Sequence, residues 1–326
     1  LRDRATEVLS RHFRDEERES DSAIRPEERS IQGKAFVSTL DIEVSLPRVK
    51  GKKKQKSRMA SLGDHEKLSG EAELHKVGEC LDWLYPDELD RAILREKELK
   101  ELTDLLSGTD RRPVLLLGPR KAGKTTVIHE CVYRRVKKRK RWFTNRRNVW
   151  HLSPQRIISG MSVVGQWEDR LLAIMSEARR KDHVLYFDDL LGLYLAGVCA
   201  SSTLSVAQVL KPHVENRDFR VLAESTPSAF RVLQERDRGF ADLFHVIRVN
   251  ETTREETLRI LITAMRQHEE QNECRFELDV LPSVMELQAR YIHDTSFPGK
   301  AAAFARRLAI KQRNDVVMRQ HVLDEF

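Results

Sequence analysis

The sequence predicts an α/β protein in which a five-stranded parallel sheet, covered by helices on both faces, is followed by a smaller helical domain. Two observations predict the sheet: short apolar segments alternate with segments of helical periodicity, and a glycine-rich loop follows the first of them. A third observation predicts the helical domain, because no strand-like segment follows Asn250. Unbroken apolar segments are typical of strands buried on both faces, as the strands of a parallel sheet are.

Each expected strand is a short apolar segment, and helical patterns such as residues 166–181 lie between the strands. The helical domain begins with two overlapping capping boxes, in which Thr252 or Thr253 is the N-cap and Glu255 or Glu256 follows three residues later. The expected strands are residues 112–118, 148–154, 183–189, 219–225 and 244–250.

Composition bounds the class of protein. Of the 326 residues, 33% are charged and 40% are hydrophobic, which is typical of a soluble protein. No apolar segment reaches the roughly 18 residues of a membrane span, and no signal-peptide pattern follows Leu1, so we expect a cytoplasmic fragment of a longer protein. The four cysteines are dispersed, which favours reduced thiols and gives no metal-binding cluster. The expected regions are a charged segment of unassigned fold at 1–78, an α/β domain at 79–250 and a helical domain at 251–326.

Positive charge is concentrated in two segments. The net charge is +7, but residues 134–147 include nine Lys and Arg and no acid, so the remainder of the chain has a net charge of −2. Residues 48–58 include seven more Lys and Arg. Trp142 and Phe143 interrupt the first segment, and basic residues interleaved with aromatic ones can hold phosphates and stack on bases. Nucleic-acid binding is therefore one alternative, although charged segments are more often solvated surface.

The segment GPRKAGKT matches the phosphate-loop pattern G-x-x-x-x-G-K-[ST] and lies between an apolar strand and a helical segment. Its glycines let the backbone wrap around a phosphate, and the N–H groups at the start of the helix point at the anion. Lys124 is expected to reach the β- and γ-phosphates, and Thr125 to bind Mg²⁺ through its hydroxyl. The expected contacts of the nucleotide with this loop are Gly118, Pro119, Arg120, Lys121, Ala122, Gly123, Lys124, Thr125 and Thr126.

Two adjacent acids, Asp188 and Asp189, follow the apolar segment 183–187. The carboxyl ends of parallel strands meet at the edge of the sheet where ligands bind. A phosphate-loop protein needs an acid there to hold its metal ion, usually through water, and Asp188 fits that role. Asp189 follows at the position from which an ATPase commonly polarises the attacking water, so it is the expected catalytic acid.

Several spaced segments resemble the AAA+ family, specifically the first ATPase domain of the Clp-type unfoldases and disaggregases, over roughly residues 81–310. They are DRAILREKELKELTDLLSGTDRRPVLLLGP, SGMSVVGQWEDRL, VAQVLKPHVENRDFRVLAESTPSAFRVLQE and ARYIHDTSFPGKAAAFARRLA. The resemblance implies a sheet of strand order 5-1-4-3-2, a helical lid, ATP with Mg²⁺, a protein client and a homo-oligomeric, hexameric ring. The site residues that it implies are Ala92, Ile93 and Leu94 beside the adenine, Ser225 and the catalytic Thr226 near the γ-phosphate, and Lys300 on the nucleotide side of the lid.

Three features depart from the family pattern. Asp189 replaces the usual glutamate, and a carboxylate misplaced by about an ångström costs up to about 10²-fold in rate. Asp242 and Leu243 replace the arginine fingers before Phe244, and such a finger contributes about 10³–10⁵-fold in related P-loop enzymes. Val163 stands where the pore loop of the family carries an aromatic residue.

These departures leave three functions open. One is an ATP-hydrolysing module that remodels proteins. Another is a nucleotide-binding switch or assembly module with little or no hydrolysis and no threading of polypeptide. The last is a nucleic-acid-linked ATPase that uses the basic segment 134–147.

Overall fold

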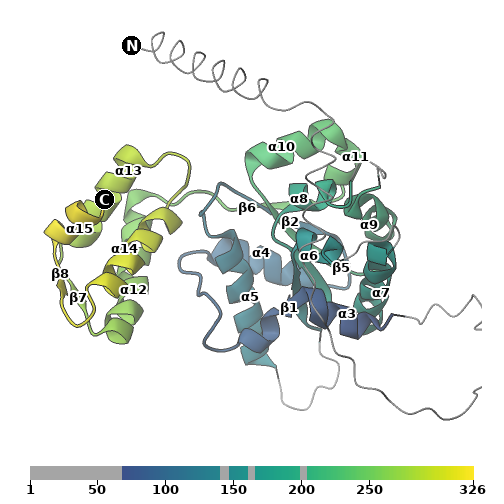
Figure 1. Ribbon diagram of the computed structural model, residues 1–326, viewed down its shortest axis with the longest axis horizontal. Coiled ribbons are helices and arrows are strands. Elements are labelled where there is room, and N and C mark those ends of the chain that lie inside the picture. Colours follow the sequence, from purple (N-terminus) through teal and green to yellow (C-terminus); the bar gives the residue numbers. More distant parts are fainter. Residues whose placement is uncertain (1–67, 140–146, 161–165, 199–203) are drawn as a thin grey trace, which may run out of the picture. The chain divides into compact units, whose positions relative to one another are not determined.

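The computed structural model describes residues 68–139, 147–160, 166–198 and 204–326, which form a sheet domain and a helical domain (Figure 1). The expectations for residues 1–67, for Trp142 and Phe143, and for Val163 lie outside the described residues. None of the described helices is long and apolar enough to cross a lipid bilayer.

The sheet has six strands in the spatial order β1-β3-β4-β5-β2-β6. Its five parallel strands, counted along the chain, have the order 5-1-4-3-2, which confirms the order that the resemblance implied. The prediction of five strands was incomplete, because β1 pairs antiparallel with β3 at one edge. The strands are β1 (Gly78–Cys80), β2 (Val114–Leu117), β3 (Val149–Leu152), β4 (Val184–Phe187), β5 (Arg220–Ser225) and β6 (His245–Arg248).

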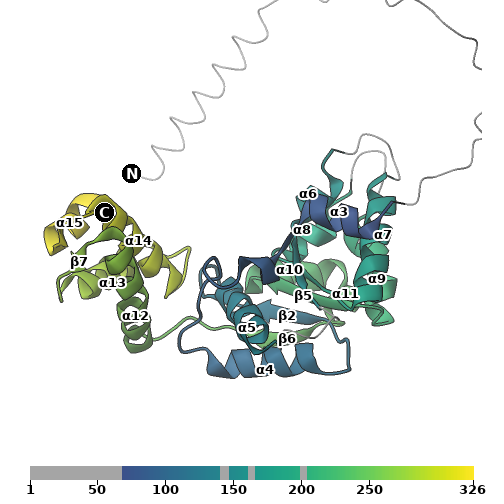
Figure 2. The same cartoon turned by 90° about the horizontal axis from the view of Figure 1, so that it is seen from below.

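Burial on both faces explains why β2 and β4 are continuously apolar, because every residue of these two strands is buried. Alternate residues serve two separate cores: Leu116 and Tyr186 belong to one, and Leu115 and Phe187 belong to the other. The first core lies under α4 and α5, and we call this the α5 face (Figure 2). The second core lies under α7, α8, α9 and α10, and we call this the α10 face. The helices of the sheet domain are α3 (Gly70–Val77), η1 (Leu81–Leu84), α4 (Glu96–Ser107), α5 (Lys124–Lys138), α6 (Pro154–Ile158), α7 (Gln166–Lys181), α8 (Leu190–Leu195), α9 (Val206–Glu215), α10 (Pro227–Arg236) and α11 (Arg238–Ala241).

The sheet domain begins before the boundary expected at residue 79. Helix α3 packs against α7, and its Leu74 and Val77 belong to the core of the α10 face. The two helices approach closely at Gly70, where a Cβ atom would lie 2.1 Å from the carbonyl oxygen of Ala173. The residues just before β1 are therefore part of the domain rather than of a separate charged segment.

The C-terminal domain has a hydrophobic core of its own, to which Leu261 and Phe304 belong. Its first helix begins after Thr253, which forms one of the two expected capping boxes with Glu256. The expectation that no strand follows Asn250 was wrong, because the short strands β7 and β8 pair in parallel. The elements are α12 (Arg254–Asn272), β7 (Arg275–Phe276), α13 (Val280–Tyr291), α14 (Gly299–Lys311), β8 (Val316–Val317) and α15 (Arg319–Glu325).

Candidate nucleotide-binding site

The glycine-rich loop joins the carboxyl end of β2 to the start of α5, as the sequence predicted (Figure 1). Gly118 is required by a close approach, since a Cβ atom there would lie 2.1 Å from the carbonyl oxygen of Val249. Gly123, the N-cap of α5, has a φ of 98°, a left-handed conformation that glycine adopts without strain. The loop therefore places the first N–H groups of a 15-residue helix at the carboxyl edge of the sheet, where they can bind an anion.

Arg95 anchors this loop to the end of the sheet. Its Nη2 donates hydrogen bonds to the carbonyl oxygens of Ala122, at 2.9 Å, and Asn250, at 2.7 Å. Arg95 is 8% exposed, and hydrogen bonds from an ionised donor are roughly twice as strong as neutral ones. Sequence reasoning missed this residue because its partners are 27 and 155 positions away, and no local pattern marks such a contact.

Lys124 lies at the loop, where the sequence placed it. Its ammonium donates to the carbonyl oxygens of Gly118 and Pro119, each at 3.0 Å. Burial lowers the pKa of Lys124, and attraction to Glu224 opposes part of that effect. The loop thus holds a cation at the start of α5, which suits contact with a phosphate.

The two expected metal ligands, Thr125 and Asp188, lie on the α5 face at the same edge of the sheet. The Nε2 of His151 is 3.4 Å from an Asp188 carboxylate oxygen, without the alignment of a hydrogen bond. This neighbour lowers the pKa of Asp188, so the carboxylate stays ionised. A hydroxyl and a carboxylate are hard oxygen donors, which fit Mg²⁺. The described residues contain no cluster of three or more His, Cys, Asp or Glu side chains that could hold a metal.

Asp189 follows Asp188 directly and stands at the start of the next helix. It is the N-cap of α8, on the α10 face, and a Cβ atom at Gly192 would lie only 2.4 Å from its Oδ2. Within the described residues, its carboxylate makes no hydrogen bond or ion pair. Both acids follow the end of β4 at Phe187, and Asp189 begins the helix that packs on the α10 face.

Ser225 and Thr226 lie at the carboxyl end of β5, and Ser225 pairs with Leu117, the residue before the loop. The Thr226 hydroxyl accepts a hydrogen bond from the backbone N–H of Ala229 at 3.2 Å, as the N-cap of α10. Thr226 therefore has a structural role that the sequence did not indicate. Its expected place near a γ-phosphate stays a prediction.

Glu224 is an acid of this edge that sequence reasoning missed. It is 5% exposed, and the hydroxyl of Tyr186 donates to its Oε1 at 2.6 Å. Burial raises the pKa of Glu224, although hydrogen bonds from Tyr186 and Thr125 and attraction to Lys124 oppose that effect. Its sequence signal is a single acid that follows the apolar residues 221–223 and precedes Ser225 and Thr226.

The segment expected beside the adenine precedes α4. Ala92 and Ile93 are partly buried, and Ala92 packs against the core of the α5 face. Leu94 has a φ of 58°, a left-handed conformation that is strained for a side chain of its kind, and it is exposed. These positions stay expected adenine contacts.

The loop also bonds to the beginning of α14 in the helical domain. The backbone N–H of Ser296 donates to the carbonyl oxygen of Arg120 at 2.9 Å, and that of Gly299 donates to Lys121 at 3.1 Å. A Cβ atom at Gly299 would lie 2.4 Å from the Lys121 oxygen, so only glycine allows this contact. Lys300 instead donates to the carbonyl oxygen of Ile292 at 2.9 Å, so its ammonium is held by the lid rather than by the loop.

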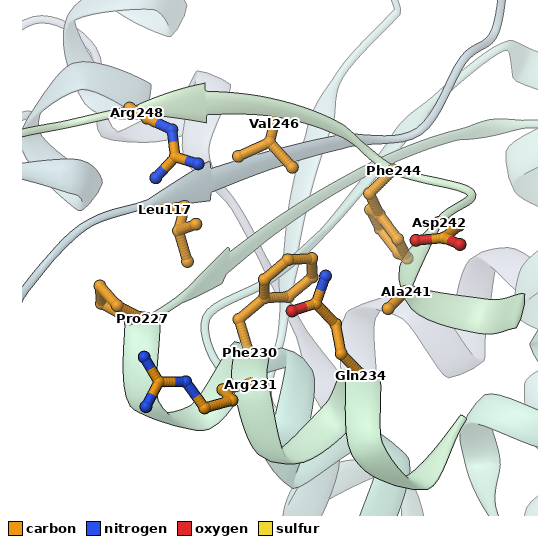
Figure 3. Close-up of a pocket in the computed structure, with 10 residues that line it drawn as sticks. All are labelled: Leu117, Pro227, Phe230, Arg231, Gln234, Ala241, Asp242, Phe244, Val246 and Arg248. Carbon is orange, nitrogen blue, oxygen red and sulfur yellow. The ribbon is translucent and has the colours of Figure 1, made fainter. Parts of the chain in front are cut away.

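A cavity of about 510 Å³ lies beside the end of β6 on the α10 face (Figure 3). Asp242, one of the two expected arginine-finger positions, lines it, whereas Leu243 packs against the core. Arg231 and Arg248 line the same cavity and form no ion pair with any described residue. The structure thus places two exposed guanidiniums near the finger positions, but neither of them is at an expected position.

Four of the six described Lys and Arg residues of the basic segment 134–147 form ion pairs. Arg134 forms ion pairs with Glu96 and Glu130, whereas Arg135 and Arg139 both pair with Asp82. Arg147 pairs with Asp182. These contacts direct four guanidiniums toward acids of the domain, which reduces the positive charge that this segment offers to a nucleic acid.

No protein-family model matches the chain. It is 27% identical over 215 residues to the ClpA homolog protein of Fuscovulum blasticum, a match that covers 66% of this chain and 27% of that protein. It is 25% identical over 240 residues to the chaperone protein ClpB of Bacteroides thetaiotaomicron, covering 73% of this chain and 28% of that protein. The chain therefore spans little more than a quarter of the length of these relatives.

Solved structures of Hsp104 have a similar fold. The closed-state cryo-EM reconstruction of Hsp104 with ATPyS and FITC casein matches 78% of this chain and 44% of that chain, with a TM-score of 0.65 and 21% identity. The extended conformation of the S. cerevisiae Hsp104:casein complex matches 76% of this chain and 43% of that chain, with a TM-score of 0.63 and 21% identity. The sheet domain and the helical domain therefore have the fold of an AAA+ module, and the chain is similar in sequence to Clp-type proteins.

Proposed function

We propose that this module binds ATP with Mg²⁺ and couples that binding to the remodelling or assembly of proteins, with slow hydrolysis. The observation that carries the proposal is the arrangement of the α5 face. There the loop, the Lys124 ammonium, the Thr125 hydroxyl and the ionised Asp188 carboxylate all lie at one edge of the sheet.

Each of these groups has a distinct task in the proposed site. The loop N–H groups from Gly118 to Thr126 and the Lys124 ammonium bind the phosphates. Thr125 and Asp188 hold Mg²⁺, which neutralises charge on the phosphates when it is bound. Ala92 and Ile93 contact the adenine. Arg95 keeps the loop in place through its bonds to the backbone.

Slow hydrolysis is proposed because the groups that would act on water and the γ-phosphate are less favourably placed. Asp189 is the catalytic acid of the proposal, but its carboxylate lies over the first turn of α8. Thr226 is already engaged as a helix cap. Asp242 and Leu243 cannot supply the positive charge of an arginine finger.

A nucleotide-binding switch without hydrolysis is the second candidate, and the same orientation of Asp189 favours it. In both cases we propose a protein client and a homo-oligomeric, hexameric ring, on the strength of the similarity to Clp-type chaperones. The three described cysteines, all buried and free, support a location in the cytoplasm. The ion pairs of residues 134–147 do not favour nucleic acid as the ligand.

Equilibrium binding of a fluorescent ATP analogue in Mg²⁺ tests the proposal, with Lys124→Ala as the matched variant. We expect saturable binding to wild type and a loss of about 10-fold or more in the variant, because a charge-assisted contact to phosphate is removed. Binding that is equally weak in both proteins would contradict the proposal. Phosphate release in the same samples then separates the two candidates, since only the slow ATPase exceeds the Lys124→Ala background.

A further inference from the structure

Residues 296–299, which we call the lid segment, lead into α14 and bond to two carbonyl groups of the phosphate loop. The N–H of Ser296 donates to Arg120 at 2.9 Å, and that of Gly299 donates to Lys121 at 3.1 Å. Ser296 is 7% exposed, so water competes little for its bond. In a planar trans peptide the N–H points away from the C=O, so fixing the Arg120 carbonyl also fixes the direction of the Lys121 N–H.

Lys121 needs such support because its backbone is left-handed. Its φ is 64°, a conformation that disfavours every residue with a side chain. A backbone of this kind persists only where the surrounding structure holds it. The bond from Gly299 reaches the carbonyl oxygen of this same residue, and a Cβ atom at Gly299 would lie 2.4 Å from that oxygen. The lid segment therefore helps to hold the loop in its shape.

The lid segment is itself held by Glu251, which lies between β6 and α12. The Glu251 Oε1 accepts a hydrogen bond from the backbone N–H of Phe297 at 2.7 Å. Among the described residues, no other side chain accepts a hydrogen bond from the lid segment. The preceding residue, Asn250, is bonded to Arg95, which also holds Ala122 in the loop. The loop, Arg95, residues 250–251 and the lid segment thus form a closed circuit of hydrogen bonds.

We propose that Glu251 is a positioning residue of the nucleotide site. Through the lid segment, it keeps the phosphate loop in the shape that binds phosphate and so slows the release of nucleotide. The inference rests on the proposed function, because a nucleotide is the ligand of that loop.

The charge of Glu251 and its hydrogen bond have opposite effects on binding. By its charge alone, an acid beside the loop repels an anionic nucleotide, so its removal would tighten binding. As a holder of the lid segment, the same acid strengthens binding, so its removal would weaken it. The two roles therefore predict changes of opposite sign when Glu251 is replaced.

The experiment measures the affinity and the release rate of a fluorescent ATP analogue, in saturating Mg²⁺, on the 326-residue chain. In Glu251→Ala we expect affinity to fall by about 5–10-fold, which is the usual effect of losing one hydrogen bond, with release faster by a similar factor. Glu251→Gln keeps an oxygen that can accept from Phe297, so its affinity should stay within about twofold of wild type or become tighter.

Glu255→Ala is the matched control. Glu255 is an exposed acid in the first turn of α12, and it forms no hydrogen bond or ion pair with any described residue. Its replacement removes the same charge without touching the lid segment, so affinity should be unchanged or slightly higher. A Glu251→Ala variant that binds as tightly as Glu255→Ala would overturn the proposal. So would a Glu251→Gln variant that binds as weakly as Glu251→Ala.

Gly299→Ala tests the same link from its other end. The added Cβ atom displaces the Lys121 carbonyl, so we expect weaker binding here too. The double variant with Glu251→Ala should bind no more weakly than Gly299→Ala alone, because both changes break one link. Losses that multiply would overturn the proposal.

Thermal unfolding without nucleotide shows which variants are folded. Glu251 is exposed, so its variants should fold, and they decide the matter if Gly299→Ala does not. Binding no stronger in wild type than in Lys124→Ala would instead overturn the proposed function, and this inference with it.

Discussion

The two faces of the sheet meet at one carboxyl edge but present different polar residues there. On the α5 face, Arg95 and Lys124 are buried and bonded to the backbone of the loop. On the α10 face, Asp189 is an exposed helix N-cap and Asp242 lines an open cavity. Under the proposed function, the groups expected to bind the nucleotide and those expected to act in its cleavage would therefore come from separate layers of this protein.

The largest effect is expected at Arg95. Replacement by Leu removes two charge-assisted hydrogen bonds to backbone carbonyl groups, so we expect the free energy of unfolding to fall by about 2–3 kcal/mol and ATP binding to weaken. Chemical denaturation and equilibrium binding measure the two effects. Arg95→Lys is the control, and it should restore little, because one ammonium does not reproduce the planar fork of arginine. Full recovery by lysine would show that charge alone holds the loop.

A matched pair of hydroxyl deletions tests the comparison of the two faces directly. Thr125→Val should weaken the Mg²⁺-dependent part of ATP binding by about 10-fold or more and change stability little. Thr226→Ala should lower the free energy of unfolding by about 1 kcal/mol, through loss of the α10 cap, and leave Mg²⁺-dependent binding unchanged. Equal loss of binding in both variants would contradict the division between the faces.

The amino end of β4 provides a test of acid stability that is independent of the site. The Nδ1 of His183 accepts a hydrogen bond from the backbone N–H of Asn148 at 3.1 Å, and burial lowers the pKa of His183. The folded state therefore favours the neutral ring. Its contribution is complete above the ordinary pKa of about 6.5 and is lost as the pH falls through the lowered folded pKa.

We expect the free energy of unfolding to fall between pH 7.5 and 5, by up to about 1.4 kcal/mol for each unit by which the pKa is lowered. In His183→Gln this part of the pH dependence should disappear, as measured by urea denaturation at each pH. An identical pH profile in the variant would show that other groups cause the loss.

The smallest effect is expected at Leu94. Its left-handed backbone strains a leucine by about 1 kcal/mol, whereas glycine adopts that conformation freely but loses more entropy on folding. Leu94→Gly should therefore raise the free energy of unfolding by about 0.5 kcal/mol. Thermal unfolding measures the gain, and Leu94→Ala is the control that keeps the strain. A glycine variant less stable than the alanine variant would contradict this reasoning.

Much of the fold could be predicted because its signals are local. Strands β2 and β4 are continuous apolar segments, and the capping box of Thr253 and Glu256 marks the start of α12. Strand β1 has only three residues and no apolar pattern, so it becomes a strand only through pairing with β3. The two-residue strands β7 and β8 likewise become strands only by pairing with each other.

Site residues that belong to a local sequence motif were predicted, whereas those placed by tertiary contacts were missed. The loop was predicted from the spacing of residues within 118–125, and Asp188 from its position directly after an apolar segment. No such pattern marks Glu224 and Arg95, since their roles arise from the register of neighbouring strands and from contacts between distant residues. The orientation of Asp189 toward α8 also depends on how the chain turns after β4, which composition does not specify.

The most direct test of the division between binding and hydrolysis compares wild type with Asp189→Glu. ATP affinity and phosphate release are measured on the same samples in saturating Mg²⁺. The longer side chain moves the carboxylate by about an ångström, so we predict release that rises by up to about 10²-fold with unchanged affinity. If Asp189→Glu changes ATP affinity to the same extent as phosphate release, or if it does not raise phosphate release, the proposed division between binding and hydrolysis is wrong.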